Sequence, residues 1–119
     1  MTAKHDLKKL QPGVFGRRLR QARTWAGTPQ DQLGVAIGLD ESTSSARISR
    51  YETGVHEPPI PTAKLLAAEL NVPLAFLYCD DEDLALALLG LHAMSTKELR
   101  CLVKEQGWAW PKKAPAGAK

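Results

Sequence analysis

The sequence lacks the features of secreted, metal-binding and membrane proteins. Its 119 residues include only 2 cysteines and 3 histidines, and none of these has the spacing of a metal-binding group. Cys79 and Cys101 stand far apart, which predicts free thiols in a reducing compartment. No apolar run is long enough to span a bilayer, and the charged N-terminus is not followed by the apolar stretch of a secretory signal. We therefore expect a cytoplasmic protein with no metal site and no cofactor.

Strand patterns and catalytic groupings are missing as well. Apolar and polar residues do not alternate and β-branched residues are few, whereas helical spacing recurs along the chain. No acid is paired with a base or a metal partner, and no serine is set beside a histidine, so an enzyme is the least expected class. With 44% hydrophobic residues, the chain can form one compact all-α domain and an appended element.

Charge is unevenly distributed along the chain. Residues 1–53 contain nine Lys/Arg and five Asp/Glu, whereas residues 54–111 contain four Lys/Arg and eight Asp/Glu. The last eight residues add three lysines. A basic half joined to an acidic half suggests that one face of the protein meets a polyanion.

The basic half predicts two helices that end at glycines. The first spans about residues 12–25 and ends at Gly27, with an apolar stripe at Phe15, Leu19, Ala22 and Ala26. Four arginines stand within seven residues on its remaining surface, namely Arg17, Arg18, Arg20 and Arg23. This density favours a phosphate contact by at least one of them. In the next segment, "TPQD", Thr28 is the expected N-cap of a short second helix that ends at Gly38.

A third helix is predicted at about residues 44–53, followed by Gly54. Ile48 marks its buried side. The opposite side is slim and cationic and consists of Thr43, Ala46, Arg47, Arg50 and Thr53. Such a surface is expected of a helix that enters a groove about 12 Å wide.

Further helices are predicted after Pro61 and after Pro73. The four acids at 80–83 then lead into the apolar segment 84–91, and the capping box "STKE" opens a last helix that ends at Gly107. A helix that is apolar all round either enters the core or packs on a second copy. The candidate dimer contacts are Leu84, Leu88, Leu91, Leu99 and Leu102. The alternative, in which both segments fold back and the fifth helix alone forms the dimer, stays open.

Residues from about Gly16 to Tyr78 resemble the phage-repressor (Cro/C1, XRE-type) helix-turn-helix family. The resemblance is carried by "GRRLRQAR", "TPQDQLGVAIGLD", "RISRYETGVHEP" and "TAKLLAAELNVPLAFLY". It implies a five-helix, lambda-repressor-like domain whose third helix enters the major groove of double-stranded DNA. One such domain touches only a few base pairs, so a homodimer on a palindromic operator is expected.

The resemblance also implies contact residues. Base contacts fall on Ser44, Ser45, Ala46 and Arg50, and phosphate contacts fall on Gln30 and Arg47. The residues themselves add Arg17 and Arg20 of the first helix to the phosphate contacts.

The chain departs from the family pattern in two places. Gly34 stands where the family usually has alanine, and the distance from Gly38 to Ile48 is about four residues longer than in typical members. These four residues either start the third helix one turn earlier or lengthen the turn before it. The composition of "DESTSS" favours an enlarged turn, in which Ser42 and Thr43 donate to phosphates while the neighbouring acids point away from DNA.

The sequence therefore predicts four parts and one function. The parts are an N-terminal arm at 1–11, a DNA-binding domain at 12–79, a C-terminal helical extension at 80–107, and a partly disordered tail at 108–119. We expect a bacterial or phage transcriptional regulator, in the first place a repressor, with no evident small-molecule ligand. The alternatives are an antitoxin-type autoregulator whose C-terminal part binds a toxin, and a protein–protein adaptor built on the same fold.

Overall fold

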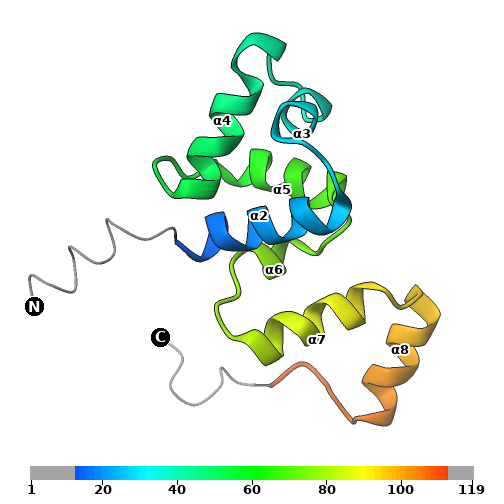
Figure 1. Ribbon diagram of the computed structural model, residues 1–119. Coiled ribbons are helices and arrows are strands. Elements are labelled where there is room, and N and C mark those ends of the chain that lie inside the picture. The colour runs from blue at the N-terminus through cyan, green and yellow to red at the C-terminus, as the bar shows by residue number, and fades with distance from the viewer. Residues whose placement is uncertain (1–12, 113–119) are drawn as a thin grey trace, which may run out of the picture.

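The computed structural model describes residues 13–112, which form seven α-helices and no strand (Figure 1). The helices are α2 (Val14–Ala26), α3 (Gln30–Ala36), α4 (Glu41–Thr53), α5 (Ile60–Glu69), α6 (Leu74–Leu77), α7 (Glu82–His92) and α8 (Thr96–Glu105). The all-α class is thus confirmed. The predictions for the arm at 1–11 and for the end of the tail at 113–119 lie outside the described residues.

Helices α2 to α6 surround one hydrophobic core. Leu19, Leu33, Ile48, Leu66 and Leu77 contribute side chains that are completely buried at its centre. Each of the five helices supplies at least one of the buried residues, so each depends on packing against the others for its stability. This confirms the predicted five-helix domain.

Most helix ends follow their sequence signals. Gly27 and Gly54 adopt left-handed φ angles of 68° and 82° directly after α2 and α4, and Asn71 does the same at 55° after α5. Ser95 and Glu98 form the predicted capping box at the start of α8. Helix α3 begins one residue later than expected, because Pro29 rather than Thr28 is its N-cap.

The predicted enlarged turn before the third helix is wrong. Helix α4 begins at Glu41, and the turn between α3 and α4 contains only residues 37–40. The side chain of Asp40 caps the helix by accepting from the Ser42 amide at 3.0 Å, and Ser44 Oγ donates to the Asp31 carbonyl oxygen on α3 at 2.6 Å. These hydrogen bonds offset the low helix propensity of the serine-rich segment.

Gly34 and the first turn of α4, which is the turn added relative to the family pattern, form one structural feature. Ser44 is completely buried, and its Oγ lies only 1.9 Å from the position that a Cβ on residue 34 would occupy. The absence of a side chain at Gly34 therefore leaves the space into which the first turn of α4 packs. The two departures from the family pattern are explained together, because the longer helix needs the glycine.

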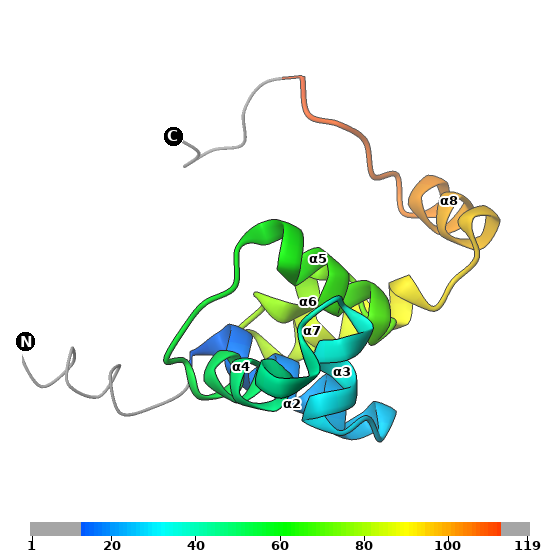
Figure 2. The same cartoon turned by 90° about the horizontal axis from the view of Figure 1, so that it is seen from above.

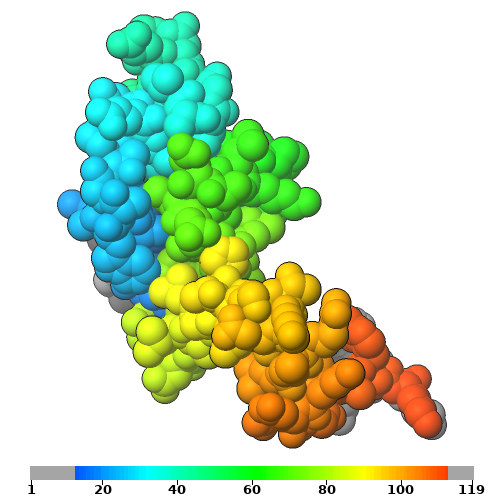
Figure 3. Space-filling model, turned by 90° about the vertical axis from the view of Figure 1, so that its right-hand side faces the viewer, coloured from blue at the N-terminus to red at the C-terminus, as the bar shows by residue number. Residues whose placement is uncertain are grey.

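The C-terminal extension is attached to the domain by α7 and the residues just before it, and not by α8. Ala85 is buried against the domain and Leu89 packs beside it, whereas α8 has no buried residue. Two views show α8 and the segment after it lying away from the core helices (Figures 1 and 2). The space-filling view shows the extension continuing from one end of the domain, with the first turn of α4 protruding at the other end (Figure 3).

Within residues 13–112, every helix is too short or too polar to cross a membrane.

Candidate nucleic-acid interface

The side of α4 opposite Ile48 is uncovered. Ile48 itself is completely buried, and the opposite side is exposed at Thr43, Ala46, Arg47, Arg50 and Thr53. We call these five residues the reading face. Its side chains are short apart from the two arginines, so the helix offers a narrow surface to a groove.

The two arginines of the reading face carry charge that no acidic side chain of the described residues neutralises. Among residues 13–112, no acidic side chain forms an ion pair or hydrogen bond with Arg47 or Arg50. Both guanidinium groups are therefore available to bases or phosphates. The acid nearest to them on the same helix, Glu52, is 5% exposed and faces the core.

Glu52 joins α2, α3 and α4 beneath the reading face. Arg23 binds its carboxylate with both Nε and Nη2, and Gln30 Nε2 donates to Glu52 Oε1 at 3.1 Å. Ser45 Oγ donates to Gln30 Oε1 at 3.2 Å. Because its amide oxygen and one amide N–H are engaged, Gln30 is held at the start of α3 with one N–H left to donate outward. This network fixes the angle between α4 and the helices behind it.

Ser44 and Ser42, both predicted contact residues, use their hydroxyls within the protein. Ser44, a predicted base contact, is wrong for that role, because it is buried and its hydroxyl binds the Asp31 carbonyl oxygen. Ser42 remains exposed, but its hydroxyl donates to Asp40 Oδ1 at 3.0 Å instead of being free for a phosphate. The amide and hydroxyl of Ser42 together lower the pKa of Asp40, so this carboxylate is ionised at neutral pH.

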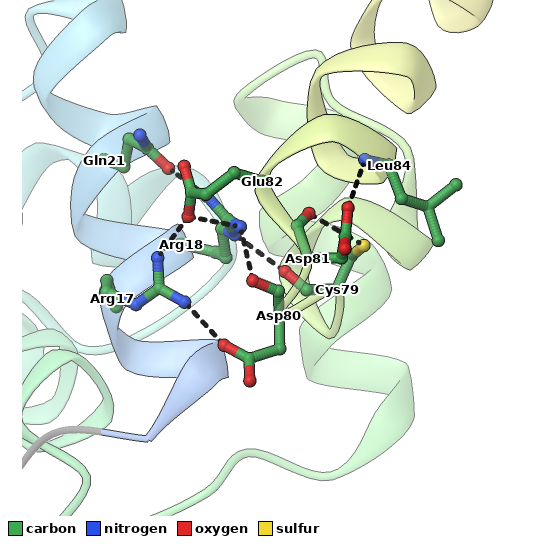
Figure 4. Close-up of polar contacts among 8 residues, drawn as sticks. All are labelled: Arg17, Arg18, Gln21, Cys79, Asp80, Asp81, Glu82 and Leu84. Carbon is green, nitrogen blue, oxygen red and sulfur yellow. Dashed lines mark hydrogen bonds and ion pairs between the residues drawn. The ribbon is translucent and has the colours of Figure 1, made fainter.

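Arg17, a predicted phosphate contact, binds the acidic segment before α7. Its guanidinium lies 2.9 Å from Asp80 Oδ1 and 3.1 Å from Glu82 Oε1 (Figure 4). A hydrogen bond from Arg17, and to a smaller extent one from Arg18, holds the pKa of Glu82 below its usual value. A phosphate would have to displace two carboxylates from Arg17, so the structure gives no support to that predicted contact.

Arg18 is the buried anchor of the extension, and the sequence did not predict this role. It is 1% exposed and donates to the carbonyl oxygens of Cys79 and Asp80 (Figure 4). Its Cζ atom also lies 5.3 Å from the centroid of the Phe76 ring. Its charge also faces Glu82 at 3.0 Å. The only signal in the sequence was the position of Arg18, next to Leu19 on the apolar side of the first helix.

Arg20 has no acidic partner among the described residues and lies close to the reading face. It lines a surface hollow of about 670 Å³ between α2 and the C-terminal end of α4, together with Thr53 and Trp25. The positive charge of Arg20 therefore lies beside the C-terminal end of α4.

The predicted dimer residues divide between the two sides of the extension. Leu84 is exposed, whereas Leu88, Leu91, Leu99 and Leu102 are half-buried. Leu88 lies on the side of α7 that faces the domain, three residues after the buried Ala85. The sequence prediction omitted Leu86, which is the most exposed leucine of α7 at 68%.

A short helix and a second helix joined by a four-residue turn, with an uncovered cationic face on the second, define a helix-turn-helix protein. The Helix-turn-helix family model matches residues 19–77. The crystal structure of transcriptional regulator BswR is similar to this chain, with 37% sequence identity and a TM-score of 0.72. The match covers 79% of this chain and 93% of that chain. A search of curated proteins gave no match.

The chain belongs to the Cro/C1-type (XRE) helix-turn-helix family. Membership identifies a DNA-binding regulator, not an enzyme, as the sequence predicted.

Proposed function

We propose that the protein is a transcriptional repressor that binds a palindromic operator as a homodimer and places α4 of each copy in the major groove. The observation that carries this proposal is the reading face, which is exposed and narrow and has two arginines without an acidic partner among residues 13–112. The similarity to transcriptional regulator BswR supports a regulatory role.

The contact residues are assigned by position and chemistry. Arg50 would donate to the O6 and N7 atoms of a guanine, and the methyl group of Ala46 would contact a thymine methyl. Ser45 is exposed as well, but its hydroxyl donates to Gln30. Arg47, Arg20 and the free N–H of Gln30 would hold the DNA backbone on either side of the helix.

Dimerisation through the extension is supported by apolar surface that the domain leaves uncovered. Leu84 and Leu86 on α7 are more than half exposed, and Trp108 after α8 is 55% exposed. Helix α8 has ten residues and no buried side chain, and an isolated helix of that length is marginal in water. A second copy would cover these surfaces and would also supply the second α4 that a palindrome requires.

The experiment is selection of bound duplexes from random DNA, followed by titration of two variants. Arg50→Ala should flatten the preference at one base pair of each half-site, which is worth about 1–3 kcal/mol. Arg20→Ala should weaken binding to all sequences about equally and reduce the slope of log affinity against log salt by about 0.9 per copy.

Identical behaviour of the two variants would contradict the division into a base-reading and a backbone residue. A wild-type protein without any sequence preference would contradict the repressor proposal itself. An operator in which the selected sequence lacks two-fold symmetry would contradict the homodimer.

A further inference from the structure

The added turn of α4 enlarges the reading face in a way that the family pattern does not include. The helix begins at Glu41 instead of residue 44, so it extends about 4.5 Å further at its N-terminal end. Thr43 in this turn stands three residues before Ala46 and seven before Arg50. Residues with this spacing lie on the same side of a helix. All three are exposed, so they form one row along the reading face.

The other residues of the added turn are not available for reading. Ser42 donates its hydroxyl to Asp40, and Ser44 is buried against Gly34. Glu41 stands seven residues before the buried Ile48 and therefore lies on the opposite side of the helix from the row. Thr43 alone exposes its methyl group and a hydroxyl whose one contact within the described residues is long, at 3.4 Å from the Asp40 carbonyl oxygen.

The surroundings of Thr43 favour a base over a phosphate. The carboxylate of Asp40 caps the N-terminal end of α4 and opposes the approach of a phosphate there. Base edges are not anionic, and those of adenine and cytosine present amino donors to the major groove. A threonine hydroxyl pairs with a donor or an acceptor, and its methyl group packs on the thymine methyl.

We propose that Thr43 is a specificity-determining residue that reads a base pair adjacent to the one faced by Ala46, on the side away from Arg50. The inference rests on the proposed DNA-binding function and replaces the phosphate contact that the sequence predicted for this residue. Seven residues of helix span about 10.5 Å, which is about three base-pair steps. The row from Thr43 to Arg50 thus extends the half-site by a base pair at its Thr43 end.

The test compares duplexes selected from random DNA by the full-length wild type, Thr43→Ala, Thr43→Val and a control, Thr96→Ala. Thr96 is an exposed threonine at the start of α8, at the other end of the molecule from α4. In Thr43→Ala, the discrimination between bases should fall about tenfold at one base pair, at the Thr43 end of each half-site. The preference at the base pair contacted by Arg50 should be kept. Thr43→Val keeps the methyl group and removes the hydroxyl, so it should retain the preference only where that preference is for thymine.

Two results would overturn the inference. One is a selected sequence for Thr43→Ala that is identical to that of the wild type. The other is an equal loss of affinity for all sequences, which would assign Thr43 to the backbone. Far-ultraviolet circular dichroism and binding to unrelated DNA at low salt verify that each variant is folded. Failure of the repressor proposal gives a different result, since the wild type itself then selects no sequence.

Discussion

At the scale of single residues, the structure depends on the contact between Gly34 and Ser44. A Cβ at residue 34 would lie 1.9 Å from Ser44 Oγ and 2.9 Å from Ser44 Cβ, both closer than real atoms approach. The serine cannot move away freely, because its hydroxyl is held by the Asp31 carbonyl oxygen. A family-typical alanine at position 34 is therefore incompatible with the first turn of α4 as it stands here.

We expect Gly34→Ala to lower the free energy of unfolding by about 1–3 kcal/mol, because overpacking forces backbone shifts in α3 and α4. Thermal or denaturant unfolding measures this change. Gly13→Ala is the matched control, since a Cβ at Gly13 meets no atom within 4 Å. A Gly34→Ala protein as stable as the wild type would show that the first turn of α4 is not held against α3.

Arg50 and Thr43 are also single-residue features, and the roles proposed for them could be predicted only in part from the sequence. The position of Ile48 predicted that Arg50 lies on the exposed side of the helix, and the family resemblance implied that it contacts a base. Thr43 was placed on the outward side, yet it was assigned to a loop and to phosphates. The start of the helix depends on hydrogen bonds to Asp31 and Gln30, which are 13 and 15 residues away from Ser44 and Ser45.

At the scale of elements, α7 is held to the domain by charge as well as by apolar packing. Arg18 binds two backbone carbonyl oxygens from a buried position, whereas Arg17 binds Asp80 and Glu82 from an exposed one. Hydrogen bonds from a buried charged group stabilise more than exposed ion pairs, which water and salt screen. The two adjacent arginines therefore differ in importance for the extension.

We expect Arg18→Met to destabilise the protein by about 2 kcal/mol or more and to increase hydrogen exchange of the α7 amides, because two carbonyl oxygens lose their donor. Methionine keeps an unbranched apolar chain over Phe76, so the loss is mainly that of the polar contacts. Arg17→Met should have a clearly smaller effect on both measurements. Equal effects of the two variants would mean that exposed and buried contacts hold α7 to the same degree.

At the scale of the whole molecule, α4 lies at one end of the described residues, and α7 and α8 lie at the other (Figure 1). The reading face therefore lies far from the exposed leucines of α7. The exposed leucines of α7 and the free side of α8 remain in water unless another chain covers them. Exposed apolar surface of this kind marks an interaction site in soluble proteins.

If the protein forms the proposed homodimer, we expect Leu86→Asp to convert it to a monomer, which sedimentation or light scattering measures as half the molecular mass. Leu86 is 68% exposed, so the substitution leaves the core of the domain intact. Leu65→Asp is the control, because Leu65 is an exposed leucine of α5 that lies outside the extension. Dissociation by Leu65→Asp alone would place the dimer contact on the domain itself. A wild type that is already monomeric would assign the apolar surface to a different protein, as the antitoxin alternative requires.

The sequence by itself determined the helical class, the order of the helices and most of their ends. These properties follow from local signals: apolar spacing, glycines such as Gly27 and Gly54, and capping residues such as Ser95. The tertiary structure decided the length of α4, the burial of Ser44 and the internal partners of Arg17 and Arg18. Each of these depends on a group distant in the chain, either a carbonyl oxygen, a carboxylate or the empty space beside Gly34. The propensities of neighbouring residues carry no information about such distant contacts. These contacts outweigh local propensity wherever they provide hydrogen bonds to polar groups that would otherwise be buried without a partner.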